Sequence, residues 1–187
     1  MRVFPFLKTP NGKYFTITPV RFLQVLGALP DVAYICDRMK NSNNPMSRQR
    51  IDRLYFSLRH RRPLRSHIMQ LFKTLHTGRK VHFFYGARSL VEAFYLEDFA
   101  EIEKEFPNFK FHLALDRPDP AADAAGVKYT AGFVHNVMYE TYLKDHETPE
   151  DIKYFMCGPP MMTKCVNELL DSLGVPPENV LYDNFGG

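Results

Sequence analysis

Cysteine is scarce in this sequence, and its spacing excludes the usual cysteine-based sites. The three cysteines, Cys36, Cys157 and Cys165, contain no C-x-x-C pair. The sequence therefore predicts no iron–sulfur cluster, no zinc site and no other metal centre. So few cysteines are typical of a protein in the reducing cytoplasm.

No stretch of the sequence is apolar for long enough to cross a membrane. The longest apolar stretch, residues 20–36, is interrupted by Arg21, Gln24, Pro30 and Asp31, whereas a spanning helix needs about 20 apolar residues. The N-terminus also lacks an apolar segment followed by a small-residue cleavage site. We therefore expect a soluble, cytoplasmic protein.

The composition that remains is typical of one globular domain. The chain has 187 residues, of which 45% are hydrophobic and 24% charged, enough for one core with an appendage. The net charge is only +3, but arginines crowd into residues 48–65. Such a cluster can bind phosphate groups, and a solvated basic face is an equally good interpretation. We expect no nucleic acid, because no aromatic residues are interleaved with it at a recognisable spacing.

The chain divides into an irregular and a regular part. Residues 1–50 have turn signals around a short apolar stretch, and we assign them no domain. From residue 51 to residue 187, strand-like runs alternate with helical patterns, and strands are predicted at residues 54–56, 81–85, 109–115, 152–156 and 180–182. This alternation predicts an α/β fold, a doubly wound five-stranded parallel sheet.

Four signals mark the beginnings and ends of helices. Ser89-x-x-Glu92 has the form of a capping box, and Thr130 is a candidate N-cap. Gly78 and Gly174 are predicted to end the helices that precede them.

Ligands of doubly wound sheets bind beyond the carboxyl ends of the strands, so the residues after each strand are the candidates for a site. Gly158 leaves no Cβ between the backbone and a flat ring. A proline suits the first turn of the next helix, whose N-terminus presents a partial positive charge to an anion. Taken alone, Cys157 would be read as a small buried side chain.

Three motifs, in this order, resemble a known family. They are Tyr85-Gly86-Ala87-Arg88, Cys157-Gly158-Pro159-Pro160-Met161-Met162 and Asp183-Asn184-Phe185-Gly186-Gly187. Together with further segments of residues 63–187 they are similar to the F subunit of Na+-translocating NADH:quinone reductases, in the ferredoxin–NADP reductase superfamily. The resemblance implies a ferredoxin reductase-like NAD-binding module that passes a hydride from NADH to FAD and on to quinone.

The resemblance also implies roles for individual residues. Cys157, beside the nicotinamide, and Phe185, covering the flavin ring, are the catalytic candidates. The cofactor-binding candidates are Tyr85, Gly86, Ala87 and Arg88 on the adenosine side, with Gly158, Pro159, Pro160 and Met161 at the other end.

One motif of that family is missing. The family's first strand should be followed by G-x-G-x-x-P, but residues 57–63 read Ser-Leu-Arg-His-Arg-Arg-Pro, and no glycine occurs between Gly27 and Gly78. Because glycines let backbone amides approach the pyrophosphate, we expect weak NADH binding. No flavin-binding barrel is recognisable before residue 51, so FAD is expected only from another domain or chain.

Two hypotheses follow. The chain is the NADH-binding module of a flavin-dependent reductase, which works with a flavin-binding domain or subunit and lies at the inner face of the cell membrane through a complex. The alternative is a non-catalytic, truncated or rearranged remnant that keeps the fold and binds its cofactor weakly. Titration with NADH separates them.

Overall fold

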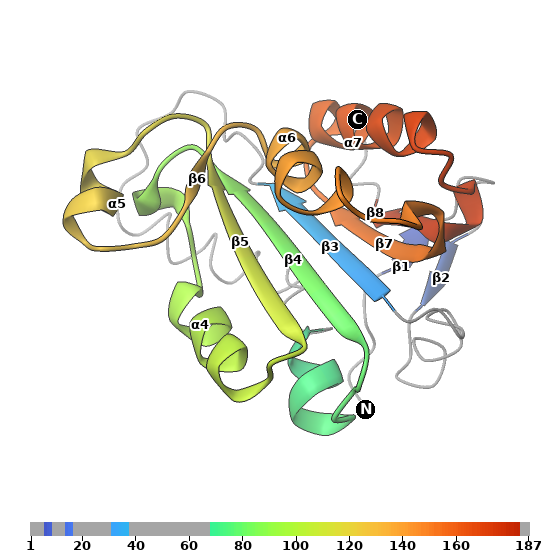
Figure 1. The fold of residues 1–187 in the computed structure, drawn as a ribbon, viewed down its shortest axis with the longest axis horizontal. Helices are drawn as coiled ribbons and strands as arrows, with labels where there is room; N and C mark the ends of the chain where they lie inside the picture. Colours follow the sequence, from blue (N-terminus) through green and yellow to red (C-terminus); the bar gives the residue numbers. More distant parts are fainter. Residues whose placement is uncertain (1–5, 9–13, 17–30, 38–67, 184–187) are drawn as a thin grey trace.

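One mixed sheet organises the part of the chain that the structure describes. The computed structural model describes residues 6–8, 14–16, 31–37 and 68–183, in which eight strands follow the order β2-β1-β8-β7-β3-β4-β5-β6 (Figure 1). The strands β3 to β8 pair with one another in parallel, whereas β1 pairs antiparallel with β2 and β8. The strands are β1 (Phe6–Lys8), β2 (Tyr14–Thr16), β3 (Asp31–Asp37), β4 (Lys80–Ala87), β5 (Phe109–Leu115), β6 (Thr130–Ala131), β7 (Ile152–Cys157) and β8 (Val180–Asp183).

The predicted fold class is confirmed, but the predicted number of strands is wrong. The strands expected at residues 81–85, 109–115, 152–156 and 180–182 are β4, β5, β7 and β8. The sheet has eight strands rather than five, because short strands extend it at both edges. The strand predicted at residues 54–56 lies outside the described residues, and β3 holds the position between β4 and β7.

β3 is the central strand, and it comes from the segment that sequence analysis left unassigned. It pairs with β4 from Asp31↔Lys80 to Asp37↔Gly86, and with β7 on its other side. Ala33, in this strand, is fully buried. The continuous apolar sequence between its two aspartates suits a parallel strand that is covered on both faces.

Helices cover both faces of the sheet, as a doubly wound fold requires. The residues packed on one face come from η2 (Gln70–Thr74), α4 (Leu96–Glu105) and α5 (Pro120–Ala124), and those on the other come from α6 (Val134–Met138), η4 (Tyr139–Leu143) and α7 (Pro160–Ser172). Successive side chains of β4 point to opposite faces of the sheet. Phe83 and Tyr85 belong to the hydrophobic cluster on the face of α4, and Phe84 belongs to the cluster on the face of α7. None of the described helices is long and apolar enough to cross a membrane.

Two predicted helix signals near β4 are wrong. The helix before β4 ends at Thr74 with Leu75 as its C-cap, and the left-handed residue that follows is His76, with φ 47°, rather than Gly78. Ser89 makes no side-chain capping bond, and only the short 3-10 helix η3 (Leu90–Glu92) follows it. The next α-helix, α4, begins after Tyr95, whose φ is 63°.

The remaining two signals have opposite outcomes. Thr130 lies in β6, and α6 begins after Phe133 without any side-chain cap, so the predicted cap is wrong. Gly174 follows α7 with φ 73°, and its amide bonds to the carbonyl of Asp171. Glycine adopts this left-handed conformation without a steric cost, so the predicted helix end at Gly174 is confirmed.

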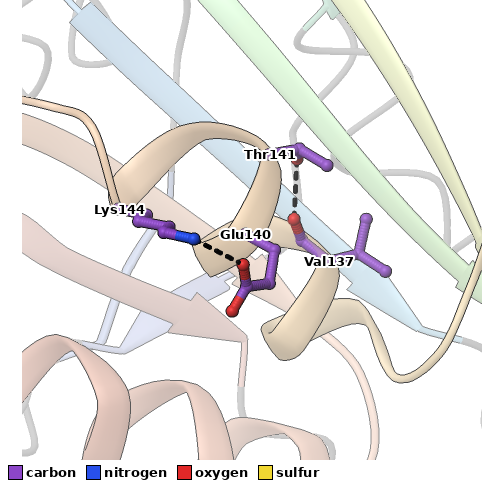
Figure 2. Close-up of polar contacts among 4 residues, drawn as sticks. All are labelled: Val137, Glu140, Thr141 and Lys144. Atoms are coloured by element: carbon purple, nitrogen blue, oxygen red, sulfur yellow. Dashed lines mark hydrogen bonds and ion pairs between the residues drawn. The ribbon is translucent and has the colours of Figure 1, made fainter.

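The helical winding changes from α in α6 to π in η4, and a threonine of η4 bonds through its hydroxyl to a backbone carbonyl one turn earlier. The Thr141 hydroxyl donates to the carbonyl oxygen of Val137 at 2.6 Å, and Lys144 pairs with Glu140 at 3.3 Å (Figure 2). Hydroxyl bonds of this kind bend helices, and η4 is a π-helical turn.

Candidate functional site

The candidate site lies at the carboxyl edge of the sheet, where the parallel strands end side by side. In the register of the sheet Cys36 pairs with Tyr85 on one side and with Cys157 on the other, and Asp37 pairs with Gly86. The ends of β4 and β7 therefore flank the end of β3. Adjacent strands are about 4.8 Å apart, so the two predicted groups of residues lie roughly 10 Å apart across this edge.

The residues at the end of β4 provide backbone groups and one exposed, positively charged side chain. Tyr85, Gly86 and Ala87 are buried, and Arg88 is exposed. The Tyr85 hydroxyl accepts a hydrogen bond from the Phe94 amide at 3.2 Å, which holds the loop after β4 against the strand. The side chain of Tyr85 thus supports the loop, and the Arg88 guanidinium is the group that can reach an anion.

At the end of β7 lie two small residues, followed by the N-terminus of a helix. Cys157 is a thiol that is only 8% exposed, and Gly158 is buried. α7 begins at Pro160, and its first turn contains no acidic side chain. The positive end of its dipole therefore faces this edge without a nearby carboxylate of its own. Gly158 contributes no Cβ at this strand end.

Sequence analysis missed a hydrogen-bonded cluster between the loops that follow β4 and β5. The Asp119 carboxylate accepts from the Leu90 amide at 2.6 Å and from the Ala121 amide at 2.9 Å. The Leu90 amide is the main cause that lowers the pKa of Asp119, so this side chain is a carboxylate. The only sequence signal was an aspartate between two prolines ahead of α5, which is typical of a helix N-cap.

The exposed large hydrophobic side chains of the described residues lie in segments that follow strands of the sheet. They are Val91, Phe94, Phe133 and Met161. Phe133, 58% exposed, stacks on His135 with ring centroids 6.0 Å apart. The partial burial of His135 lowers its pKa, which favours the neutral imidazole beside that ring.

Part of the predicted site lies outside the described residues. This is the case for Phe185 and for the turn at residues 57–63. The roles of Cys157 and of the other predicted contacts remain predictions. Within the described ranges, no group of three or more His, Cys, Asp or Glu side chains is arranged to hold a metal ion.

Known proteins share both the sequence and the fold of this chain. Over 125 residues it is 54% identical to the F subunit of the Na(+)-translocating NADH-quinone reductase of Actinobacillus succinogenes, an alignment that covers 67% of this chain and 30% of that protein. The chain therefore spans less than a third of the length of such a relative. This likeness confirms the resemblance inferred from the three motifs.

Solved structures of reductases have the same fold at low sequence identity. The CS-b5R domains of human Ncb5or, in the NAD+ form, match with a TM-score of 0.61 and 12% identity over 92% of this chain and 42% of that chain. A ferredoxin NADP+ reductase from Neisseria gonorrhoeae with bound FAD and NADP matches with a TM-score of 0.54 and 15% identity, over 92% of this chain and 65% of that chain. These likenesses show the fold.

The family assignment rests on a further match. The family model described as the oxidoreductase NAD-binding domain matches residues 62–168, which is more than half of the chain. The match includes the strand ends of β4, β5 and β7, where the candidate site lies. The chain therefore belongs to the oxidoreductase NAD-binding domain family.

Proposed function

We propose that this chain binds NADH along the carboxyl edge of its sheet and presents the nicotinamide to a flavin held by another domain or subunit. In this proposal the chain serves a reductase that delivers electrons to quinone, as the name of its relative suggests. The observation that carries the proposal is the parallel register that sets Gly86 and Cys157 on either side of the end of β3.

Each end of the dinucleotide has a suitable place in this arrangement. Arg88 is exposed where the adenosine and its phosphate would lie. Gly158 and the small Cys157 add no bulky side chain of their own at the other end, and the missing Cβ of Gly158 suits a planar ring beside the backbone. The N-terminus of α7, which has no acid in its first turn, favours an anionic ligand nearby.

The chemistry divides between protein and cofactors. FAD, when bound by its own domain, would accept the hydride of NADH with its two electrons and so release NAD+. The residues of this chain contribute binding and orientation, which hold the nicotinamide in one position against the flavin. In the proposal Cys157 packs beside the nicotinamide without blocking the transfer, and Phe185 covers the flavin face until NADH enters.

Titration of the purified chain with NADH, followed by nicotinamide fluorescence, tests the proposal. We expect saturable binding with a weak, micromolar or higher Kd, because residues 57–63 lack the glycines that bring amides to the pyrophosphate. Arg88→Ala should weaken it by about tenfold, since a charged hydrogen bond contributes roughly 1.5 kcal/mol. Lys104→Ala, an exposed change on α4, is the matched control and should leave the Kd unchanged.

The alternative, a remnant without cofactor affinity, makes the opposite prediction. It is supported if NADH up to millimolar concentration gives no saturable signal. If Arg88→Ala and Lys104→Ala weaken NADH binding equally, the result contradicts a site at the carboxyl edge. Submicromolar affinity would show that the arginines at residues 59–62 replace the missing glycines.

A further inference from the structure

The loops that follow β4, β5 and α5 meet at one buried carboxylate. Of the charged side chains that the structure describes, Asp119 is the one that is buried, with 9% of its surface exposed. One carboxylate oxygen accepts from the Ala121 amide, within its own helix start, at 2.9 Å. The other accepts from the Leu90 amide at 2.6 Å, 29 residues away in the chain.

The backbone of the same residue makes a third connection. The Asp119 amide donates to the Tyr129 hydroxyl at 2.9 Å, and that hydroxyl donates to the Asp123 carboxylate at 3.0 Å. Tyr129 lies just before β6. Asp119 therefore connects segments that leave or approach β4, β5 and β6.

Helix capping does not account for this arrangement. An N-cap needs one side-chain oxygen for one amide of its helix, and the bond to Ala121 supplies it. The second, shorter bond goes to the loop that begins with Arg88. A charged acceptor makes a stronger hydrogen bond than a neutral one, and Asp119 is shielded from water, which strengthens the bond further.

We propose that Asp119 is a positioning residue for the adenosine half of NADH. It holds the loop after Arg88 against the loop after Asp116, so that the edge of β4 and β5 is ordered before the ligand arrives. An ordered loop spares the ligand the entropic cost of fixing it. The inference rests on the proposed function, because it presupposes that NADH lies along this edge.

Two variants separate positioning from capping. Asp119→Ser keeps an N-cap for α5, since serine is a preferred capping residue, but its hydroxyl is too short to reach both amides. Leu90→Pro removes the donor at the other end, and Ser89 is already extended, with φ −156° and ψ 165°, as a residue before proline prefers. Leu90→Ala keeps the donor and is its matched control.

Binding of each half of the cofactor provides the test. ADP-ribose and reduced nicotinamide mononucleotide are titrated separately by calorimetry, and NADH by fluorescence, with folding monitored by circular dichroism. We expect Asp119→Ser and Leu90→Pro to weaken ADP-ribose binding about fivefold. Both variants should leave the affinity for the mononucleotide unchanged. Leu90→Ala should leave the affinities for both half-ligands unchanged.

Three results overturn the inference, and one of them also removes the proposed function. Unchanged ADP-ribose affinity in both variants means that the bond between Asp119 and Leu90 does not position the site. Equal losses for both half-ligands mean that the variants only loosen the fold. If the wild-type chain binds neither NADH nor ADP-ribose, the proposed function fails and the inference fails with it.

Discussion

His112 makes the stability of this domain depend on pH, because its imidazole is largely buried between aromatic rings. It stacks on Phe84 with ring centroids 4.4 Å apart, and its Nε2 lies 3.1 Å from Nδ1 of His82. Burial lowers the pKa of His112 from 6.5 to about 4, an effect that Glu103 opposes and Lys128 reinforces. The folded state therefore favours the neutral ring.

The direction and size of the effect follow from this shift. Since the folded pKa lies below the unfolded one, the unfolded chain binds the proton first as the pH falls, and stability is lost between pH 6.5 and pH 4. The shift of His112 from 6.5 to about 4 corresponds to at most about 3 kcal/mol, at about 1.4 kcal/mol for each unit. Between pH 7 and pH 5 the expected loss is roughly 2 kcal/mol.

Urea unfolding at pH 7 and pH 5, followed by circular dichroism, measures this loss. His112→Phe keeps a ring against Phe84 and removes the titrating group, so its free energy of unfolding should change less between the two pH values, by roughly 2 kcal/mol. Phe111→Leu, a non-ionisable change at the neighbouring position of β5, controls for destabilisation alone and should keep the wild-type difference. The reasoning is refuted if His112→Phe loses as much stability as the wild-type chain.

Three further changes test the fold itself. Tyr154→Phe removes the hydroxyl that donates to the Pro149 carbonyl at 2.8 Å, and should cost about 1 kcal/mol in urea unfolding; no change would mean that water replaces the bond. Gly174→Ala, at φ 73°, should lower the free energy of unfolding by about 1 kcal/mol, and a gain in stability would contradict the left-handed assignment. Lys73→Ala breaks the exposed pair with Glu105 and should leave the urea midpoint unchanged, because surface ion pairs contribute little; a clear fall in the midpoint would contradict this.

Most strands of the sheet interior could be predicted from the sequence, whereas β3 and the short edge strands could not. β4, β5 and β7 contain runs of apolar residues long enough to identify them. β6 has two residues, both exposed, so nothing in its composition marks a strand. β3 has a suitable apolar run, but turn signals on both sides made the segment look irregular.

Signals at helix ends were less reliable, because they depend on contacts that are distant in the sequence. The Leu90 amide finds its acceptor in Asp119, 29 residues later, rather than in the side chain of Ser89. That residues 86–88 and 157–161 lie at one edge of the sheet could be predicted, since the carboxyl ends of parallel strands meet at the same edge. The buried role of Asp119 could not, because it depends on how the loops after β4 and β5 fold together.

The short strands at the two edges of the sheet affect how copies of this chain behave at high concentration. β2 has three residues and β6 has two, so the edges of the described sheet offer few unpaired amides to a neighbouring molecule. The apolar strands β7, β3 and β4, whose sequences would favour intermolecular pairing, have partners on both sides. Fraying of an edge strand therefore releases only a few residues and leaves these aggregation-prone segments protected.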